Sequence, residues 1–525
     1  MVKRLSLRNL QSDIYFIISI VAIFFIYGYN HTTKLGSYSA HQWRQSDCLS
    51  ITSNYYEEDL NFLETKINWC GKQGVRNVVS EFPIIYFFVA KLWKIFGKEP
   101  GIYRLINLII FSFGLFALYK IFQKLLLSNF WAITLTLFLF TSPLLAYYAN
   151  NFIMNSTAFS LVLIGLYFNI CYYKNTKAKL LLCGNFFYLM AALLKVTALL
   201  SFIGLLPIHY YLLFRKRATK KKIAHYCPPI IVLILVFSWY YYAHQYNQSN
   251  LQGIFLQGIL PFWDLNFLQF RSTLILLYHN LLPNYFSHGV LFFIILAFIY
   301  SALNFKKTNK LLFVLCLNCI IGSISYIILF FQVFNVHDYY LINLLIVPPI
   351  TILQFFVLLK RINSEILNSR SLKAISLIVL VALIYNTAVL TRVKYKSHDR
   401  MVKYSFILDN QAKNRWSSYH WRYKNTFKKL ETIEPYLREL GINRHDKVIS
   451  IPDYSINITL SLMNQIGFTD FGFNDLKGEE RIEHFIDLGA KYLIINDSTL
   501  KKEKYIKPYL QHHFGQYENI DIYQL

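Results

Sequence analysis

Long runs of apolar residues, separated by short polar segments, fill the first three quarters of the chain. Most of these runs are long enough for one α-helix to cross about 30 Å of hydrocarbon, which takes about 20 residues. The pattern therefore predicts about eleven transmembrane helices. We place them at residues 13–30, 102–122, 129–149, 153–173, 180–194, 196–214, 228–246, 286–305, 311–331, 341–359 and 373–391.

Basic residues gather in the short segments that follow every second run. Because basic loops stay in the cytoplasm, these segments and the amino terminus are assigned to that side, and an odd number of crossings puts the carboxy terminus outside. The assignment reads 180–214 as two crossings around Lys195; one long helix would reverse every later loop. The cytoplasmic segments carry Lys120 and Lys124, Lys174 to Lys179, the 215–222 cluster, Lys306 to Lys310, and Lys360 with Arg361.

The segment from Phe82 to Gly97 is apolar but short, and it contains Lys91 and Lys94. An amphipathic helix that lies at the membrane interface accounts for both the length and the lysines. If this segment does not cross, the first external loop is long and spans residues 31–101.

The character of the chain changes near residue 392. Alternating patterns predict strands at 447–452 and 491–495 and helices at 456–466 and 480–488, which is typical of a small α/β domain. No glycine-rich phosphate loop occurs there, so we assign it no nucleotide. The predicted fold is a polytopic α-helical membrane protein, residues 1–391, with a C-terminal extracytoplasmic α/β domain, residues 392–525.

Composition supports membrane residence, since 55% of the residues are hydrophobic, only 15% are charged, and the mean hydropathy is +0.35. The net charge of +25 comes largely from the short loops, so the predicted partner is the lipid bilayer and not nucleic acid. Cys48 and Cys70 are the two cysteines of the external loop. They either form a disulfide in an oxidising periplasm or stay free thiols.

Charged and aromatic residues gather on the predicted external side, where charges beside a membrane usually mark function. Their types suit an anionic lipid substrate: cations bind a phosphate, a carboxylate takes a proton, and aromatic rings bind a sugar or an isoprenoid chain. Each also has a structural explanation, such as a loop ion pair between Arg44 and Asp47 or a helix cap at Glu81. The candidates are Arg44, Asp47, Glu81, Arg104, Lys195, His337, Asp338, Tyr339 and Tyr340.

The order of these motifs resembles that of the GT-C superfamily of membrane glycosyltransferases. The likeness is to the bacterial relatives of dolichyl-phosphate-mannose protein mannosyltransferases and to lipid A aminoarabinose transferases, and it covers roughly residues 10–360. The matching segments are Trp43-Arg44-Gln45-Ser46-Asp47, Glu81-Phe82-Pro83 with Arg104, Thr141-Ser142-Pro143 through Asn155, Leu194-Lys195-Val196-Thr197, and His337-Asp338-Tyr339-Tyr340.

This resemblance implies an inverting transfer of a sugar from a polyprenyl-phosphate carrier to an envelope acceptor (lipid, glycan or protein) at the periplasmic face of a bacterial inner membrane. Asp47 would be the general base, and Glu81 would orient the sugar or support the base. The implied donor-binding residues are Arg44, Arg104, Lys195, His337, Asp338, Tyr339 and Tyr340. We predict no soluble nucleotide sugar. The sequence offers no cluster of metal ligands, and it leaves the requirement for a divalent metal open.

Three positions depart from the family pattern. Cys48 stands where many members have Glu, which weakens a paired-carboxylate or metal role at Asp47. Phe82 stands where some members have Lys, so phosphate binding depends on other cations. Asn155 replaces a common acidic residue and removes a second carboxylate at that turn.

Three other functions stay open. A polymerase or ligase for diphosphate-linked oligosaccharides shares the lipid carrier but normally lacks the Glu-x-Pro helix. A transporter of lipid-linked sugars predicts inverted repeats and charges near the midplane, neither of which the sequence shows. An inactive scaffold predicts that Asp47→Asn leaves glycosylation unchanged.

Overall fold

The protein's computed structural model describes residues 2–215, 223–250, 253–256, 258–396, 398–473 and 475–525. Apart from Arg215, the basic cluster at 215–222 lies outside these residues. The described chain forms two compact units, which we treat separately. Unit 1 comprises residues 1–33, 104–240 and 258–392, and unit 2 comprises 34–103, 241–257 and 393–525.

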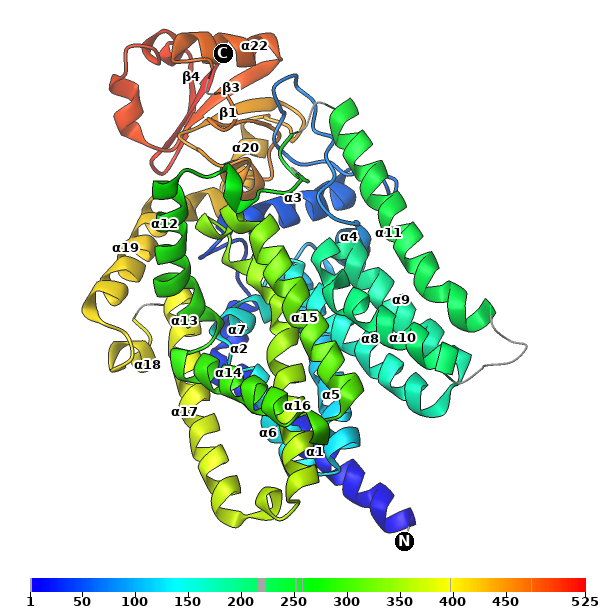
Figure 1. The fold of residues 1–525 in the computed structure, drawn as a ribbon. Coiled ribbons are helices and arrows are strands. Elements are labelled where there is room, and N and C mark those ends of the chain that lie inside the picture. The colour runs from blue at the N-terminus through cyan, green and yellow to red at the C-terminus, as the bar shows by residue number, and fades with distance from the viewer. Residues whose placement is uncertain (1, 216–222, 251–252, 257, 397, 474) are drawn as a thin grey trace. The chain divides into compact units, whose positions relative to one another are not determined.

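Unit 1 is built from helices (Figure 1). Helix α5 begins in unit 2, and helices α11 and α17 end in it. The main ones are α1 (Val2–Tyr27), α2 (Tyr29–Thr32), α5 (Pro100–Leu126), α6 (Asn129–Leu139), α7 (Pro143–Ala149), α8 (Asn155–Asn175), α9 (Ala178–Leu194), α10 (Leu199–Arg215), α11 (Ile223–Ser249), α12 (Phe267–Leu276), α13 (Leu282–Tyr285), α14 (His288–Leu303), α15 (Lys310–Leu329), the 3-10 helix η6 (Asp338–Ile346), α16 (Val347–Ile362) and α17 (Arg370–Tyr395).

Within the described residues, eight helical segments are long and apolar enough to cross a membrane, or up to ten if two bent helix pairs each count as one span. The polytopic helical fold predicted from the hydrophobic runs is confirmed. Two predicted spans, 129–149 and 286–305, were wrong in detail. The first is broken into α6 and α7 at an angle of 83°. The second corresponds to α14, which is bent by 85° against the preceding helical segment Phe267–Tyr285.

The break between α6 and α7 has a local cause. Ser142 caps α7 by accepting a hydrogen bond from the backbone N–H of Leu145, and Pro143 occupies the first turn. Proline suits the first turn of a helix but cannot continue a preceding one, so a new helix starts here in a new direction. At 178–215 the structure has two helices, α9 and α10, with Lys195 between them.

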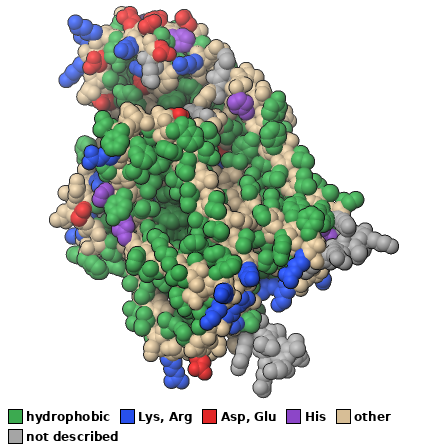
Figure 2. Space-filling model, in the orientation of Figure 1, with side chains coloured by type: hydrophobic (Ala, Val, Ile, Leu, Met, Phe, Trp, Pro, Cys, Tyr) green, Lys and Arg blue, Asp and Glu red, His purple; other side chains and the backbone are tan. Residues whose placement is uncertain are grey.

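The surface of unit 1 is apolar. Hydrophobic side chains cover its helices in Figure 2. Phe113, Phe237 and Ile378 are each more than half exposed, at 61%, 73% and 70%. Apolar side chains exposed to this extent on long helices are favourable in contact with lipid and unfavourable in contact with water.

Unit 2 mixes helices with one sheet. Its helices are α3 (Gln42–Glu57), α4 (Ile84–Phe96), α18 (Arg400–Lys403), α19 (Asn410–Thr426), α20 (Glu434–Glu439), α21 (Ile458–Leu462) and α22 (Glu479–Asp487). Its strands are β1 (Lys447–Ile451), β2 (Gly467–Phe468), β3 (Ala490–Ile495), β4 (His513–Tyr517) and β5 (Ile520–Gln524).

The five strands lie in the order β2-β1-β3-β5-β4. β1 pairs in parallel with β2 and β3, whereas β5 pairs antiparallel with β3 and β4. The predicted α/β domain is confirmed, with β1 and β3 at the predicted strands. The predicted helix 456–466 is shorter, as α21, and the sequence pattern did not predict β2, β4 and β5.

Most of the loop predicted to be external, residues 34–101, belongs to the same compact unit as the C-terminal residues. Its backbone extends the sheet at β2, where the Cys70 N–H donates to the Gly467 carbonyl at 2.7 Å and the Gly467 N–H donates to the Asn68 carbonyl at 3.1 Å. This pairing covers an edge that would otherwise be open. Cys48 and Cys70 are buried free thiols, so the disulfide alternative is not formed.

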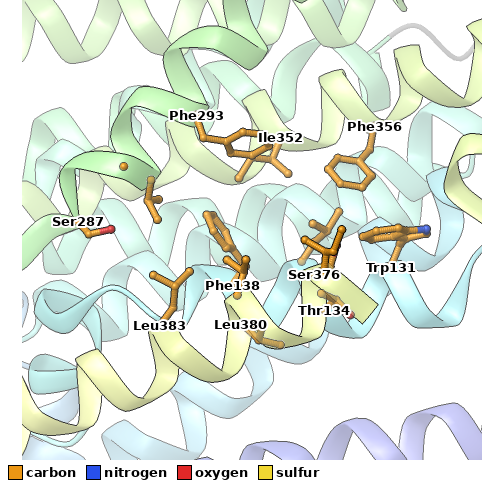
Figure 3. Close-up of a pocket in the computed structure, with 15 residues that line it drawn as sticks. Trp131, Thr134, Phe138, Ser287, Phe293, Ile352, Phe356, Ser376, Leu380 and Leu383 are labelled. Atoms are coloured by element: carbon orange, nitrogen blue, oxygen red, sulfur yellow. The ribbon is translucent and has the colours of Figure 1, made fainter. Parts of the chain in front are cut away.

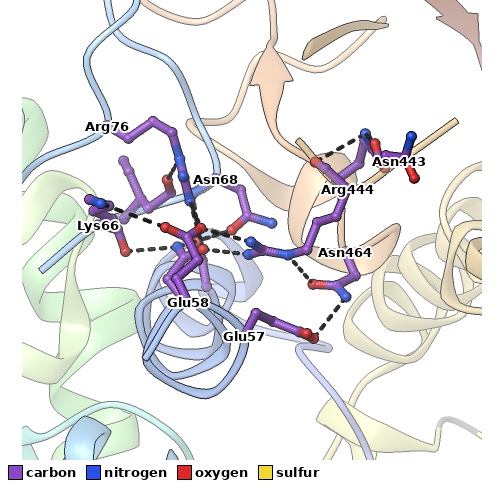
Figure 4. A network of polar contacts seen from close by, with 12 residues as sticks. Glu57, Glu58, Lys66, Asn68, Arg76, Asn443, Arg444 and Asn464 are labelled. Atoms are coloured by element: carbon purple, nitrogen blue, oxygen red, sulfur yellow. Dashed lines mark hydrogen bonds and ion pairs between the residues drawn. The ribbon is translucent and has the colours of Figure 1, made fainter. Parts of the chain in front are cut away.

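A polar network holds the C-terminal end of α3 within unit 2 (Figure 4). The Glu58 carboxylate accepts from Arg76 at 2.8 Å and from Arg444 at 2.7 Å, and Asn464 donates to Glu57 at 3.1 Å. Burial alone would raise the pKa of Glu58, but hydrogen bonds and charge from the two arginines lower it to about 2. Glu58 is therefore ionised at neutral pH and links α3 to the C-terminal region.

Candidate active site

Helix α3 places two candidate residues, Arg44 and Asp47, on one side. They are three positions apart, which is close to one helical turn. Both are buried, as are most side chains of this helix. The hydrophobic pattern does not reveal α3 because polar residues fill most of its positions, so it reads as a loop in the sequence.

Glu81 lies against Arg44. The Arg44 Nη2 atom is 2.6 Å from Oε1 and 2.5 Å from Oε2 of Glu81. The Ser80 and Tyr86 hydroxyls also donate to Oε2, at 2.5 and 2.6 Å. Tyr86 belongs to α4, the helix predicted at the interface, so the start of α4 holds this carboxylate in place.

Asp47 is 1% exposed, and its ion pair with Arg44 is longer than the ion pair between Arg44 and Glu81. Arg44 Nη1 is 3.5 Å from its Oδ2, and the Asn457 amide donates to its Oδ1 at 2.6 Å. Burial raises the pKa of Asp47 to about 7, against the lowering effects of Arg44 and Asn457, while Glu81 raises it further. A carboxyl group with a pKa near neutrality can both take and release a proton.

Arg104, the first residue of unit 1 after the loop, is fully buried. Its Nη1 donates to the Asn150 carbonyl at 2.6 Å, and its guanidinium carbon lies 4.1 Å from the centre of the Phe152 ring. The arginine therefore contacts the segment that joins α7 to α8.

His337, Asp338, Tyr339 and Tyr340 contact the same junction. The Tyr148 hydroxyl of α7 donates to Asp338 Oδ1 at 2.5 Å, and the Asn155 amide of α8 donates to the Tyr339 carbonyl at 3.1 Å. The three rings of His337, Tyr339 and Tyr340 pack together, with centroids 5.1 to 5.8 Å apart.

Lys195 ends α9, and it is half-buried. Two residues later, Thr197 accepts a hydrogen bond from the Asn343 amide of η6. The lysine turn is thereby linked to the helix that carries Asp338 and Tyr339.

The nine candidates thus form two groups. In unit 2 the structure joins Arg44, Asp47 and Glu81 by direct contacts. In unit 1 it connects Arg104 and the His337–Tyr340 segment through the α7–α8 junction. The turn that contains Lys195 is joined to this group by the hydrogen bond between Asn343 and Thr197. The loop ion pair between Arg44 and Asp47 exists, but it is buried and shared with a second carboxylate.

Sequence reasoning missed several partners. Ser80 and Tyr86 could have been suspected, because they flank Glu81 in the chain. Tyr148 lies inside the segment from Thr141 to Asn155 that was matched to the family, but it was not singled out. Asn457 stands 410 positions from Asp47, and nothing near it in the sequence indicates the contact.

No family model and no curated protein matches this chain. Among solved structures, it is similar to ArnT from Cupriavidus metallidurans in the apo state, with 10% identity, 97% of each chain covered and a TM-score of 0.57. It is also similar to ArnT from the same organism bound to undecaprenyl phosphate, with 10% identity, 97% of each chain and a TM-score of 0.58. This chain has the GT-C fold. The match spans unit 1 and unit 2, so the C-terminal sheet belongs to the shared architecture.

A cavity of about 440 Å³ lies within the GT-C helices of unit 1 (Figure 3). Its walls come from α6, α14, α16 and α17, among them Phe138, Phe293, Ile352 and Leu380. No charged side chain is among its lining residues, and none of the nine candidates lines it. The cavity suits an apolar chain and does not provide partners for a phosphate.

Proposed function

We propose that this protein is an inverting glycosyltransferase that moves a sugar from a polyprenyl-phosphate carrier to an acceptor in the bacterial cell envelope. The observation that carries the proposal is Asp47, a buried carboxyl group with a pKa of about 7, beside one cation and a second carboxylate. The GT-C fold and a structural neighbour bound to undecaprenyl phosphate support the lipid-linked donor.

Asp47 acts as the general base in this reaction. It takes the proton of an acceptor hydroxyl while the hydroxyl oxygen attacks the anomeric carbon. The bond between that carbon and the phosphate oxygen breaks, and the carrier leaves as polyprenyl phosphate. One displacement inverts the anomeric centre. Glu81 holds Arg44, which keeps a positive charge beside the base.

The donor is bound by the other candidates. Arg104 and Lys195, with Arg44, supply positive charge for the leaving phosphate, since cations stabilise charge that grows on a phosphoryl oxygen. His337, Tyr339 and Tyr340 form an aromatic surface for the sugar or isoprenoid, and Asp338 holds that segment against Tyr148. The proposed location is the inner membrane, with the site on the periplasmic face.

The test is sugar transfer by the purified protein in detergent, from a panel of polyprenyl-phosphate sugars, with release of the carrier phosphate as the readout. We expect release by the wild type and a loss of about a hundredfold or more in Asp47→Asn, because a positioned general base contributes about 10² to 10⁴. Thermal denaturation of both proteins confirms that the variant folds.

Asp59→Asn is the matched control. Asp59 follows α3 in the same loop, its side chain is 74% exposed, and it pairs only with lysines of α4 among the described residues. We expect full activity. Equal release by wild type and Asp47→Asn would contradict Asp47 as the base. Absence of release by the wild type, from every donor and with envelope extract as acceptor, would contradict the function.

A further inference from the structure

The C-terminal region contributes a residue that touches Asp47. Asn457 stands immediately before α21 and is fully buried. Its Nδ2 donates to Asp47 Oδ1 at 2.6 Å, the shortest contact recorded for this carboxyl group. Because an ionised carboxylate only accepts hydrogen bonds, the amide N–H of Asn457 is suited to stabilise the charged form of Asp47.

The segment before Asn457 is held firmly. The Asp453 carboxylate accepts four hydrogen bonds, from the backbone N–H and hydroxyl groups of Ser455 and Thr459, at 2.6 to 2.8 Å. The Ser455 hydroxyl in turn accepts from the N–H of Ile458 at 2.8 Å. This turn therefore fixes the backbone on both sides of Asn457.

Helix α21 is also fastened to the loop that carries Asp47. Asn68 donates to the Leu460 carbonyl at 3.2 Å, and the Ser461 hydroxyl donates to the Ser46 carbonyl at 3.3 Å. Contacts on both sides of the Asn457–Asp47 pair reduce the freedom of the two side chains to separate. A hydrogen bond held in this way orients the carboxyl group before any substrate binds.

Asn457 is poorly explained as a structural residue. Its Oδ1 is buried and has no hydrogen-bond partner among the residues that the structure describes. An unpaired buried acceptor lowers the stability of the fold, because the acceptor has lost its hydrogen bonds to water. Stability alone would favour an apolar side chain at this position, whereas a role toward Asp47 accounts for the amide.

We propose that Asn457 is a positioning residue of the transferase site, which orients the base Asp47 and favours its ionised form. The role rests on the function proposed above, and it makes the C-terminal domain a necessary part of the catalytic centre. Asn457 acts through Asp47, so the loss of its side chain changes the pH at which Asp47 ionises as well as the rate of transfer.

Three neighbours of Asp47, namely Arg44, Cys48 and Tyr86, do not change charge near neutral pH. Burial lowers the pKa of Arg44, but Glu81 and its other neighbours raise it well above its usual range. Burial raises the pKa of Cys48 to about 11 and that of Tyr86 well above its usual range. The groups that face this site from α3, the Ser80–Glu81 segment, α4 and the start of α5 are Arg44, Cys48, Glu81, Tyr86 and Tyr103.

The experiment compares wild type with Asn457→Ala and Asn457→Asp in the full-length protein, using the polyprenyl-phosphate sugar that the wild type accepts. Carrier release is measured as kcat/KM across pH 5 to 9. We expect Asn457→Ala to lower the rate by about ten- to a hundredfold and to move the acid limb of the profile upward by about one pH unit. Asn457→Asp should move it further, because a second carboxyl group opposes ionisation of Asp47.

Asn496→Ala is the matched control, since Asn496 is another buried asparagine of the same domain, 3% exposed, with both side-chain polar atoms unpaired among the described residues. We expect it to keep the wild-type profile. A folded Asn457→Ala protein whose acid limb coincides with that of the wild type would overturn the positioning role, whatever its Tm. That result leaves the transferase intact, whereas an inactive wild type refutes the proposed function itself.

Discussion

Around Asp47, the guanidinium group of Arg44 forms ion pairs of unequal length with two carboxyl groups. Arg44 lies 2.5 to 2.6 Å from the oxygens of Glu81 but 3.5 Å from Asp47. Glu81 therefore takes most of the available positive charge, and Asp47 is left buried with a raised pKa of about 7. Two carboxyl groups in one site can divide two tasks when their surroundings differ in this way.

The pH dependence of transfer follows from this division. Asp47 is a base only when ionised, so kcat/KM should fall about tenfold per pH unit below pH 7 and level off above it. Glu81→Gln removes a negative charge that raises the pKa of Asp47, so the acid limb should move to lower pH, opposite to Asn457→Ala. Infrared difference spectra of the Asp47 carboxyl group, read against Asp47→Asn, give the same pKa without requiring activity.

Glu64→Gln supplies the matched control for Glu81→Gln. Glu64 lies in the same loop, its side chain is 36% exposed, and it pairs with Lys66. We expect the acid limb of the kcat/KM profile to stay at the wild-type pH in this variant. A shift of that limb to higher pH in Glu81→Gln would show that Glu81 does not act on Asp47 through its charge.

At the scale of elements, close helix packing sets the position of the α7–α8 junction. Gly114 of α5 faces α8 so closely that a Cβ atom would come within 2.6 Å of Ser160 Cβ and 2.7 Å of its Cα. A side chain has no room there unless the backbone of α8 shifts. Asn155, which binds the Tyr339 carbonyl, begins the same helix α8.

Gly114→Ala should therefore destabilise unit 1 by about 1 to 3 kcal/mol, the usual cost of overpacking. Thermal denaturation in detergent measures it as a lower Tm. Gly289→Ala in α14 is the control, because a Cβ there meets nothing within 4 Å and alanine favours a helix. A Gly114→Ala protein as stable as Gly289→Ala would mean that α5 and α8 are not in such close contact.

At the scale of the whole molecule, the basic segments predict the orientation in the membrane. A reporter fused after Lys222 should read as cytoplasmic and one fused after Leu525 as periplasmic, because the predicted spans after Lys222 are odd in number. A third fusion after Lys307 should again read as cytoplasmic. Reporters after Lys222 and Leu525 on the same side would contradict both the orientation and the periplasmic site.

The extent of what could be predicted differs between the units. Hydrophobic runs identify the long helices of unit 1, since lipid requires continuous apolar segments whatever the neighbours are. They do not reveal the break at Ser142-Pro143, because the serine cap and the proline that cause it lie within a continuous apolar run. The 83° angle between α6 and α7 is known only from the structure. In unit 2, α3 escaped prediction because its buried face is polar and is satisfied by hydrogen bonds from distant residues.

By itself the sequence determined the class of fold, the helix α4 and the strands β1 and β3, and it selected the nine candidate residues, because these depend on local composition and on motif order. Only the tertiary structure decided that Arg44 serves Glu81 more than Asp47, that Cys48 and Cys70 stay apart, and that Asn457 reaches Asp47. The physical reason is that a pKa and a hydrogen bond depend on distance in space and on burial, and neither is encoded by spacing along the chain.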